Sequence, residues 1–124
     1  MQNIVTAKSL LLWNTINLVE NAKLEKIEIG DYFANLFQVK ANGREYDATH
    51  DSYFEFLNQF RATILSIQYD THDIITDKTN VVISLTAHIT RTDNSVENFE
   101  AILILKFNPD NRIVLWNEVY VKTT

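Results

Sequence analysis

Three polar residues in the second half of the chain are the candidates for chemistry: Asp70, His72 and Glu118. Glu118 lies between Trp116 and Tyr120 in an alternating segment. Burial among such aromatic walls raises the pKa of a carboxyl group and suits it to proton transfer near neutral pH. His72 can polarise a carbonyl or move a proton, and Asp70 on the same face can orient it. We therefore predict an acid–base site with Glu118 as the general acid and base.

The turns between the last four strands decide which side chains share a face of the sheet. We expect these strands over about 64–76, 81–91, 95–107 and 112–122. Directly opposed residues of antiparallel strands lie on the same face. The loop lengths therefore predict a row across the sheet that contains His72, Leu85, Ala101 and Glu118. The two flanking rows are Asp70, Ala87, Phe99 and Tyr120, and Ile74, Ile83, Leu103 and Trp116.

Each candidate also has a structural alternative. Glu118 could be hydrogen-bonded to a helix residue such as Asn14 or Asn17, or could lie in water at an open rim. Asp70 and His72 could form a solvated pair on an edge strand, because polar residues alternate there as they do on an exposed edge. Structural groups also show perturbed pKa values, so the pattern alone does not separate these alternatives from a catalytic site.

The residues expected to line a ligand pocket are large and apolar. A plain hydrophobic core would explain the aromatic ones equally well. Metal sites need three or four convergent ligands, and the chain lacks the histidine spacing that is typical of them. We therefore expect no metal and no cofactor. The predicted ligand-binding residues are Trp116, Tyr120, Trp13, Phe99, Leu103 and Tyr53.

The first half of the chain supplies the elements that must position this site. Asn42-Gly43 accepts the two positive φ values of a tight hairpin turn, and Thr49 or Asp47 can cap a following helix. From apolar spacing we expect a helix over about 4–24, a short helix within 25–34, a hairpin over 36–47 and a third helix over about 50–63.

Composition excludes several classes of protein. The chain has 124 residues, no cysteine and a net charge of −5, so we expect one domain over 1–124 without disulfides or thiolate chemistry. The net negative charge argues against nucleic acid as a partner. The two glycines of the chain cannot build a phosphate-binding loop. No apolar stretch is long enough to span a membrane. We predict a cytoplasmic protein.

The order of these elements resembles the nuclear transport factor two-like superfamily, which includes SnoaL-like proteins and ketosteroid isomerases. The local signals are Tyr32-Phe33-Ala34, the helix after Thr49, and Asn111-Arg112-Ile113 before a strand that contains Glu118. The resemblance implies an α+β fold with three helices on the concave face of a strongly curved, mainly antiparallel sheet of about six strands. It also implies an apolar pocket and a homodimer through the outer sheet face. The apolar residues that we expect on that face, among them Val119 and Val121, favour the same partner.

Comparison of the family's functional residues with the matching positions of this sequence distinguishes between the possible activities. The proton-abstracting carboxylate of the isomerases falls at about Ala41 and their protonated acid at Leu103, so ketosteroid isomerase chemistry is not expected. Glu118 and His72 resemble the acidic residue and the histidine of SnoaL-like cyclases. We predict a SnoaL-like domain that binds a small apolar molecule and acts as a cofactor-free isomerase, cyclase or dehydratase. The alternative is a non-catalytic interaction or structural homodimer module, because fold alone does not assign activity.

Overall fold

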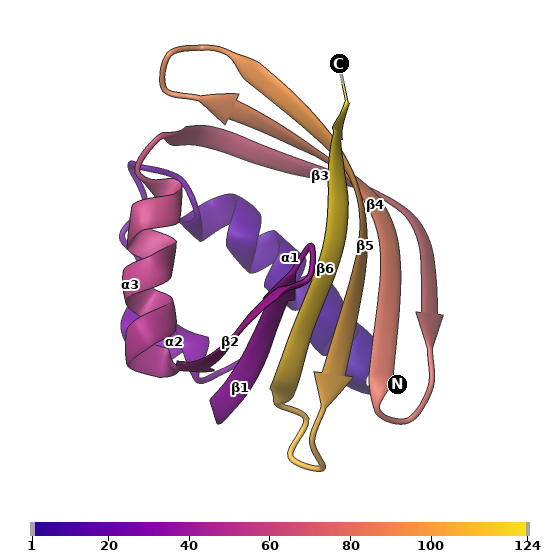
Figure 1. Ribbon diagram of the computed structural model, residues 1–124. Coiled ribbons are helices and arrows are strands. Elements are labelled where there is room, and N and C mark those ends of the chain that lie inside the picture. Colours follow the sequence, from indigo (N-terminus) through magenta and orange to yellow (C-terminus); the bar gives the residue numbers. More distant parts are fainter. Residues whose placement is uncertain (1, 124) are drawn as a thin grey trace.

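The computed structural model describes residues 2–123 as three helices and one six-stranded sheet (Figure 1). The strand order is β2-β1-β6-β5-β4-β3, and all neighbours are antiparallel except β1 and β6. The predicted fold class is confirmed. The elements are α1 (Gln2–Asn17), α2 (Lys26–Ile29), β1 (Phe33–Ala41), β2 (Arg44–Thr49), α3 (His50–Arg61), β3 (Ile64–Thr76), β4 (Asn80–Arg91), β5 (Val96–Phe107) and β6 (Ile113–Thr123).

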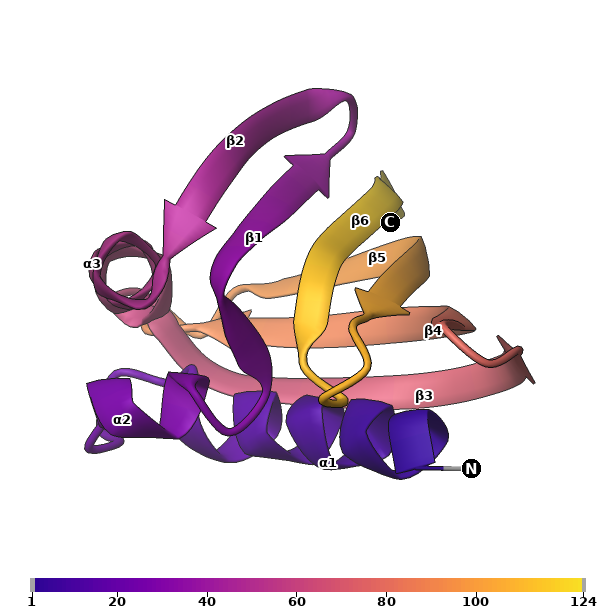
Figure 2. The same ribbon diagram turned by 90° about the horizontal axis from the view of Figure 1, so that it is seen from below.

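The sheet curves strongly, and the helices close its concave side (Figure 2). Helix α1 packs against β3 and β4, whereas α3 packs against β1 and β2. The core lies between these layers and follows the alternation of the strands, with Val81, Ile83 and Leu85 of β4 all at most 3% exposed. Burial of each such side chain contributes about 1.5–3 kcal/mol. No helix within residues 2–123 combines the length and apolar character needed to cross a bilayer.

The hairpin and the third helix form as their sequences predict. Asn42 and Gly43 adopt φ values of 50° and 84°, which is the left-handed pair that a tight turn between β1 and β2 requires. Thr49 caps α3, since its hydroxyl accepts a hydrogen bond from the Ser52 backbone while the Ser52 hydroxyl accepts one from the Thr49 backbone. Asp47, the other proposed cap, lies within β2 instead.

The first helix is shorter than predicted and ends at Asn17 rather than near residue 24. The backbone of the segment that follows is hydrogen-bonded to residues far along the chain. The Arg61 guanidinium donates to the carbonyls of Val19 and Ala22 at 2.9 and 2.6 Å, and the Glu20 amide donates to the Ile64 carbonyl at 2.8 Å. These tertiary hydrogen bonds replace helical ones and override the apolar spacing.

The predicted pairing of β4 with β5 is confirmed, whereas that of β5 with β6 is wrong by two residues. Glu118 lies opposite Leu103 rather than Ala101. Two irregularities cause the shift, one residue each: Phe107 pairs with Ile113 rather than with Arg112, and a bulge then pairs Lys106 with Leu115. A shift of two residues preserves the face of every side chain. Glu118 therefore still points to the concave side, as predicted.

The predicted pairing of β3 with β4 is correct at one end and wrong at the other. Ile74 faces Ile83 as expected, but the register shifts between Thr71 and Asp73. His72 is the extra residue of this bulge, and a shift of one residue exchanges the two faces. Asp70 consequently pairs with Thr86 and lies on the outer face of the sheet. The prediction that Asp70 and His72 share a face with Glu118 is wrong.

Candidate functional site

A cavity of about 510 Å³ lies between the concave face of the sheet and the helices α1 and α3. Its wall is mainly apolar and aromatic, which is typical of small-molecule sites. The lining residues used below are Asn14 of α1, Ala41 of β1, Arg44 of β2, Tyr53 of α3, Tyr69 of β3, Ala87 and Arg91 of β4, Phe99 and Ala101 of β5, and Trp116, Glu118 and Tyr120 of β6.

Among residues 2–123, Glu118 is the only acidic residue in the wall of this cavity. It is half-buried on β6 and lies beside Ala41 of β1 in the parallel pairing. Burial raises the pKa of its carboxyl group, while the indole of Trp116 acts in the opposite direction. Among residues 2–123, none forms an ion pair with it. A carboxyl group with a raised pKa in an apolar cavity is a candidate for proton transfer.

Asn14, Tyr53 and Tyr69 supply further polar atoms to the wall of this cavity. The Asn14 amide donates to the Tyr69 hydroxyl over 3.4 Å. Burial raises the pKa of Tyr69 to about 12, and it also raises the pKa of Tyr53. The negative charge of Glu118 contributes to both increases, which places the three groups in one electrostatic neighbourhood. Both tyrosines are therefore neutral hydroxyl donors at physiological pH.

Sequence reasoning missed Tyr69 and considered Asn14 only as an alternative hydrogen-bond partner of Glu118. The bulge at His72 turns Tyr69 into the cavity, and Asn14 bonds to Tyr69 rather than to Glu118. The signal that could have revealed this was the apolar pair Ile67 and Tyr69 on β3, which alternates with polar Gln68 and Asp70. Burying Ile67 and Tyr69 requires these two residues, and not Gln68 and Asp70, to face the cavity, which is the opposite of what the loop lengths indicate.

The structure does not bring Asp70 and His72 to this cavity. The His72 ring bonds to the Thr86 hydroxyl at 2.7 Å, and Asp70 accepts from the His88 ring at 2.8 Å. Both contacts lie on the outer face of β3 and β4. Asp70 and His72 are thus separated from Glu118 by the sheet itself.

Four of the six predicted ligand-binding residues line the cavity: Tyr53, Phe99, Trp116 and Tyr120. The other two are structural. Trp13 is buried, and its indole N–H donates to Glu28 at 2.9 Å. Leu103 is 1% exposed and belongs to the core beside Glu118. The strand pairing predicted the correct face for Leu103, but it did not predict that its side chain is buried in the core instead of lining the cavity.

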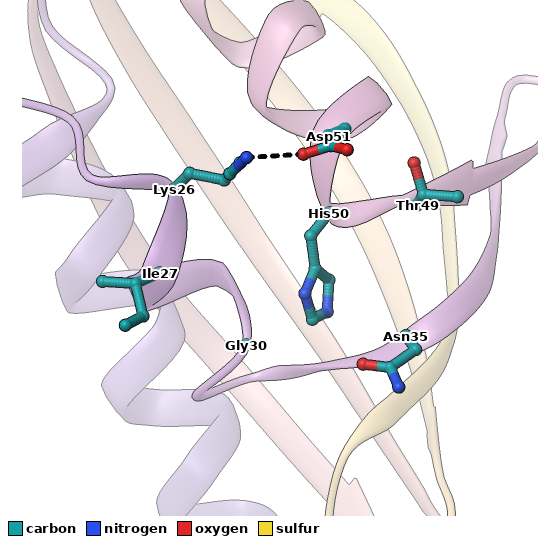
Figure 3. Close-up of a pocket in the computed structure, with 7 residues that line it drawn as sticks. All are labelled: Lys26, Ile27, Gly30, Asn35, Thr49, His50 and Asp51. Carbon is teal, nitrogen blue, oxygen red and sulfur yellow. Dashed lines mark hydrogen bonds and ion pairs between the residues drawn. The ribbon is translucent and has the colours of Figure 1, made fainter.

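A second, more open depression lies between α2 and the start of α3 (Figure 3). Lys26 and Asp51 form an ion pair of 2.7 Å at its edge. The His50 ring points into it, and its Nε2 donates to the carbonyls of Phe33 and Ala34 at 3.0 Å each. These contacts tie α3 to β1, so His50 has a structural role here. Within residues 2–123, no group of three or more acidic or histidine side chains is arranged to hold a metal ion.

The raised pKa of Glu118 predicts a specific pH dependence of stability. The folded protein retains this proton above the pKa of the unfolded chain, about 4.3, so the folded state binds more protons in that range. The free energy of unfolding then falls as pH rises from there through the folded-state pKa. Glu118→Gln has no proton to lose, and we expect it to be more stable than the wild type at neutral pH.

Urea denaturation between about pH 4 and 8 measures this difference. Glu55→Gln is the matched control, since Glu55 is an exposed carboxyl on α3. The two glutamine variants should differ in their pH profiles, with only Glu118→Gln flatter than the wild type. A Glu118→Gln profile parallel to that of the wild type would contradict the burial of an ionisable carboxyl group.

Solved structures of similar shape identify the fold. Neither a protein-family model nor a curated protein matches the sequence. A nuclear transport factor two-like protein of unknown function from Burkholderia pseudomallei superimposes with a TM-score of 0.73 at 13% identity, over 95% of this chain and 89% of that one. An LEH-like epoxide hydrolase of M. tuberculosis gives 0.71 at 13% identity, over 97% and 83% of the two chains.

A third similar structure is SalBIII, an epoxide hydrolase/cyclase-like enzyme in pyran ring formation in the polyether salinomycin. It superimposes with a TM-score of 0.70 at 12% identity, over 98% of this chain and 95% of that one. At such low identity the likeness establishes the fold and not the activity. The chain has the nuclear transport factor two-like fold.

Proposed function

We propose that the cavity binds a small, mainly apolar organic molecule and that Glu118 transfers a proton on it without a cofactor. One observation carries this proposal. Glu118 is a half-buried carboxyl group with a raised pKa and no ionic partner among residues 2–123, and it lies in the wall of a mainly apolar cavity of about 510 Å³. Groups with such a pKa in a cleft are candidates for general acid–base catalysis.

The neighbouring polar groups supply the rest of the chemistry. Asn14 donates to the Tyr69 hydroxyl oxygen, so the Tyr69 proton can point to a ligand atom in the cavity. The Glu118 carboxylate removes a proton from carbon beside a ligand carbonyl, and Tyr69 hydrogen-bonds the oxygen that becomes negative. The protonated Glu118 then returns the proton to the same carbon or, where a double bond is conjugated with the enolate, to the far carbon of that system. Asn14 and Tyr69 thus replace the predicted pair of Asp70 and His72.

Structures with the same fold support this class of chemistry. The protein from M. tuberculosis is described as an epoxide hydrolase, and SalBIII as epoxide hydrolase/cyclase-like. Opening or forming such rings requires a proton to be given or taken beside an apolar substrate. We extend that requirement to this chain, because its cavity offers one carboxyl group among apolar walls. SnoaL-like cyclase, isomerase and dehydratase reactions are the candidates.

An NMR titration with an apolar ketone such as 2-decanone tests binding. We expect the signals of cavity residues such as Ala87 and Ala101 to shift. Ala41→Phe fills the cavity and should weaken binding about tenfold or more, a loss of about 1.4 kcal/mol. Ser84→Phe adds the same ring on the outer face of β4 and should leave binding unchanged. Unperturbed cavity signals, or equal binding by Ala41→Phe and the wild type, would overturn the proposal.

A second function, association through the outer face of the sheet, is favoured by the apolar side chains exposed there. Ile102, Val119 and Val121 are 45, 61 and 61% exposed, and Ile102 lies opposite Val119 on the neighbouring strand. We propose that two copies pair through this face. Sedimentation velocity should then show a dimer for the wild type and a monomer for Val119→Lys, whereas a monomeric wild type at micromolar concentration would refute it. A cytoplasmic location stays a prediction.

A further inference from the structure

We propose that the ligand of this cavity is an organic anion whose carboxylate binds Arg44 while its apolar body fills the interior. This inference rests on the proposed function and specifies the class of molecule that the site takes. It depends on a cation in the cavity wall that the protein itself leaves unpaired. Arginine suits such a role, because its planar guanidinium forms two parallel hydrogen bonds to one carboxylate.

Two arginines line the cavity, and their surroundings differ. Arg91 is held by Glu97 at 2.7 Å and by the Thr63 hydroxyl at 3.1 Å, so its charge is already neutralised. Arg44 is exposed and forms no ion pair or side-chain hydrogen bond among residues 2–123. The neighbouring cation Lys40 does pair, with Glu45 at 3.3 Å. Arg44 is therefore the cavity cation that is available to a ligand.

The charge of the cavity wall contrasts with that of the whole chain. The protein has 16 acidic and 11 basic residues and a net charge of −5. Its cavity wall nevertheless contains two arginines and one carboxyl group, and because Arg91 is paired with Glu97, the unpaired charges of the wall are those of Arg44 and Glu118. The raised pKa of Glu118 reduces its negative charge. An anion that enters the cavity thus meets the unpaired positive charge of Arg44 on an otherwise acidic protein.

The strand pairing fixes the distance between Arg44 and the proposed proton-transfer group. Arg44 is paired with Ala41, and Ala41 is paired with Glu118 on its other side. Two strand spacings, about 10 Å, therefore separate the backbones of Arg44 and Glu118. The Asn42 side chain exchanges hydrogen bonds of 2.8 and 3.1 Å with the Tyr120 backbone, which holds this end of the hairpin on β6. A ligand anchored at Arg44 can therefore place carbon atoms beside Glu118.

Calorimetric titration with decanoate and decanamide tests this inference. The two probes share one apolar chain and differ in charge. We expect decanoate to bind the wild type about tenfold more tightly than decanamide, and Arg44→Gln to lose that difference while it retains decanamide binding. Raising the salt concentration from about 0.05 to 0.5 M should weaken decanoate binding alone. Lys40→Gln, which removes the paired cation on the opposite face of β1, is the matched control.

The possible results distinguish recognition of the carboxylate by Arg44 from binding of the apolar chain in the cavity. Equal affinity for the two probes, or undiminished decanoate binding by Arg44→Gln, overturns the role of Arg44 and leaves an apolar binding cavity intact. Binding of neither probe overturns the inference, and the separate titration with 2-decanone then decides whether the proposed function fails with it. Loss of decanoate binding in Lys40→Gln as well as in Arg44→Gln would point to a general charge effect and would also overturn it.

Discussion

Replacing Glu118 by glutamine is expected to lower the rate of proton transfer in the cavity by about 10²- to 10⁴-fold, the range for loss of a general acid or base. Glutamine preserves the shape of the side chain but can neither accept nor give a proton at this pH. The assay needs no knowledge of the natural substrate. Exchange of the hydrogens beside the carbonyl of 2-decanone for deuterium, followed by NMR in D₂O, reports proton transfer directly.

Three further variants serve as controls for the effect of Glu118→Gln on the exchange rate. Glu55→Gln changes an exposed carboxyl of α3 and should exchange at the wild-type rate. Tyr69→Phe removes the proposed hydrogen-bond donor and should slow exchange by about 10²- to 10³-fold, as loss of a single such donor does. Ala41→Phe should slow exchange about tenfold or more at a ketone concentration below saturation, because it weakens binding of the ketone. If Glu118→Gln exchanges as fast as the wild type, Glu118 is not the proton-transfer group.

The fold was accessible from sequence because its turns carry strong local signals. Asn42-Gly43 admits few conformations other than a tight hairpin turn, and Thr49 with Ser52 caps α3 through contacts three residues apart. The predicted bounds of β3 agree with the structure, and the other long strands differ by at most about one residue at each end. The end of α1 was not accessible, since it depends on Arg61, which lies far along the chain.

The site could be predicted only in part, because every bulge or change of loop length alters which side chains of the paired strands share a face. Between β5 and β6, a longer loop and a bulge each shifted the register by one residue, and their sum of two left the face of Glu118 unchanged. The bulge at His72 moved its neighbours by one residue and exchanged Asp70 for Tyr69 in the cavity. A loop length contains no information about a bulge within the strand. The size of the apolar side chains on each face of β3 does, and it favoured Tyr69.

Replacing Phe33 by alanine is expected to destabilise the protein by about 3–5 kcal/mol, a large share of the 5–15 kcal/mol typical of a domain. Phe33 is 2% exposed. Its ring lies 4.5 Å from that of Phe37 and 5.0 Å from that of Tyr53, centroid to centroid. The aromatic cluster therefore joins β1 to α3, and its member Tyr53 also lines the cavity. Alanine would leave a void that this packing cannot close.

Urea denaturation of Phe33→Ala measures the loss, and two other variants calibrate it. Phe33→Leu retains most of the buried volume and should lose about 1.5 kcal/mol or less. Ile27→Ala removes a side chain that is 83% exposed and should stay within about 0.5 kcal/mol of the wild type. Because Tyr53 rests on Phe33, Phe33→Ala should also weaken binding of 2-decanone. A destabilisation no larger than that of Ile27→Ala would mean that α3 is held over the cavity by other contacts.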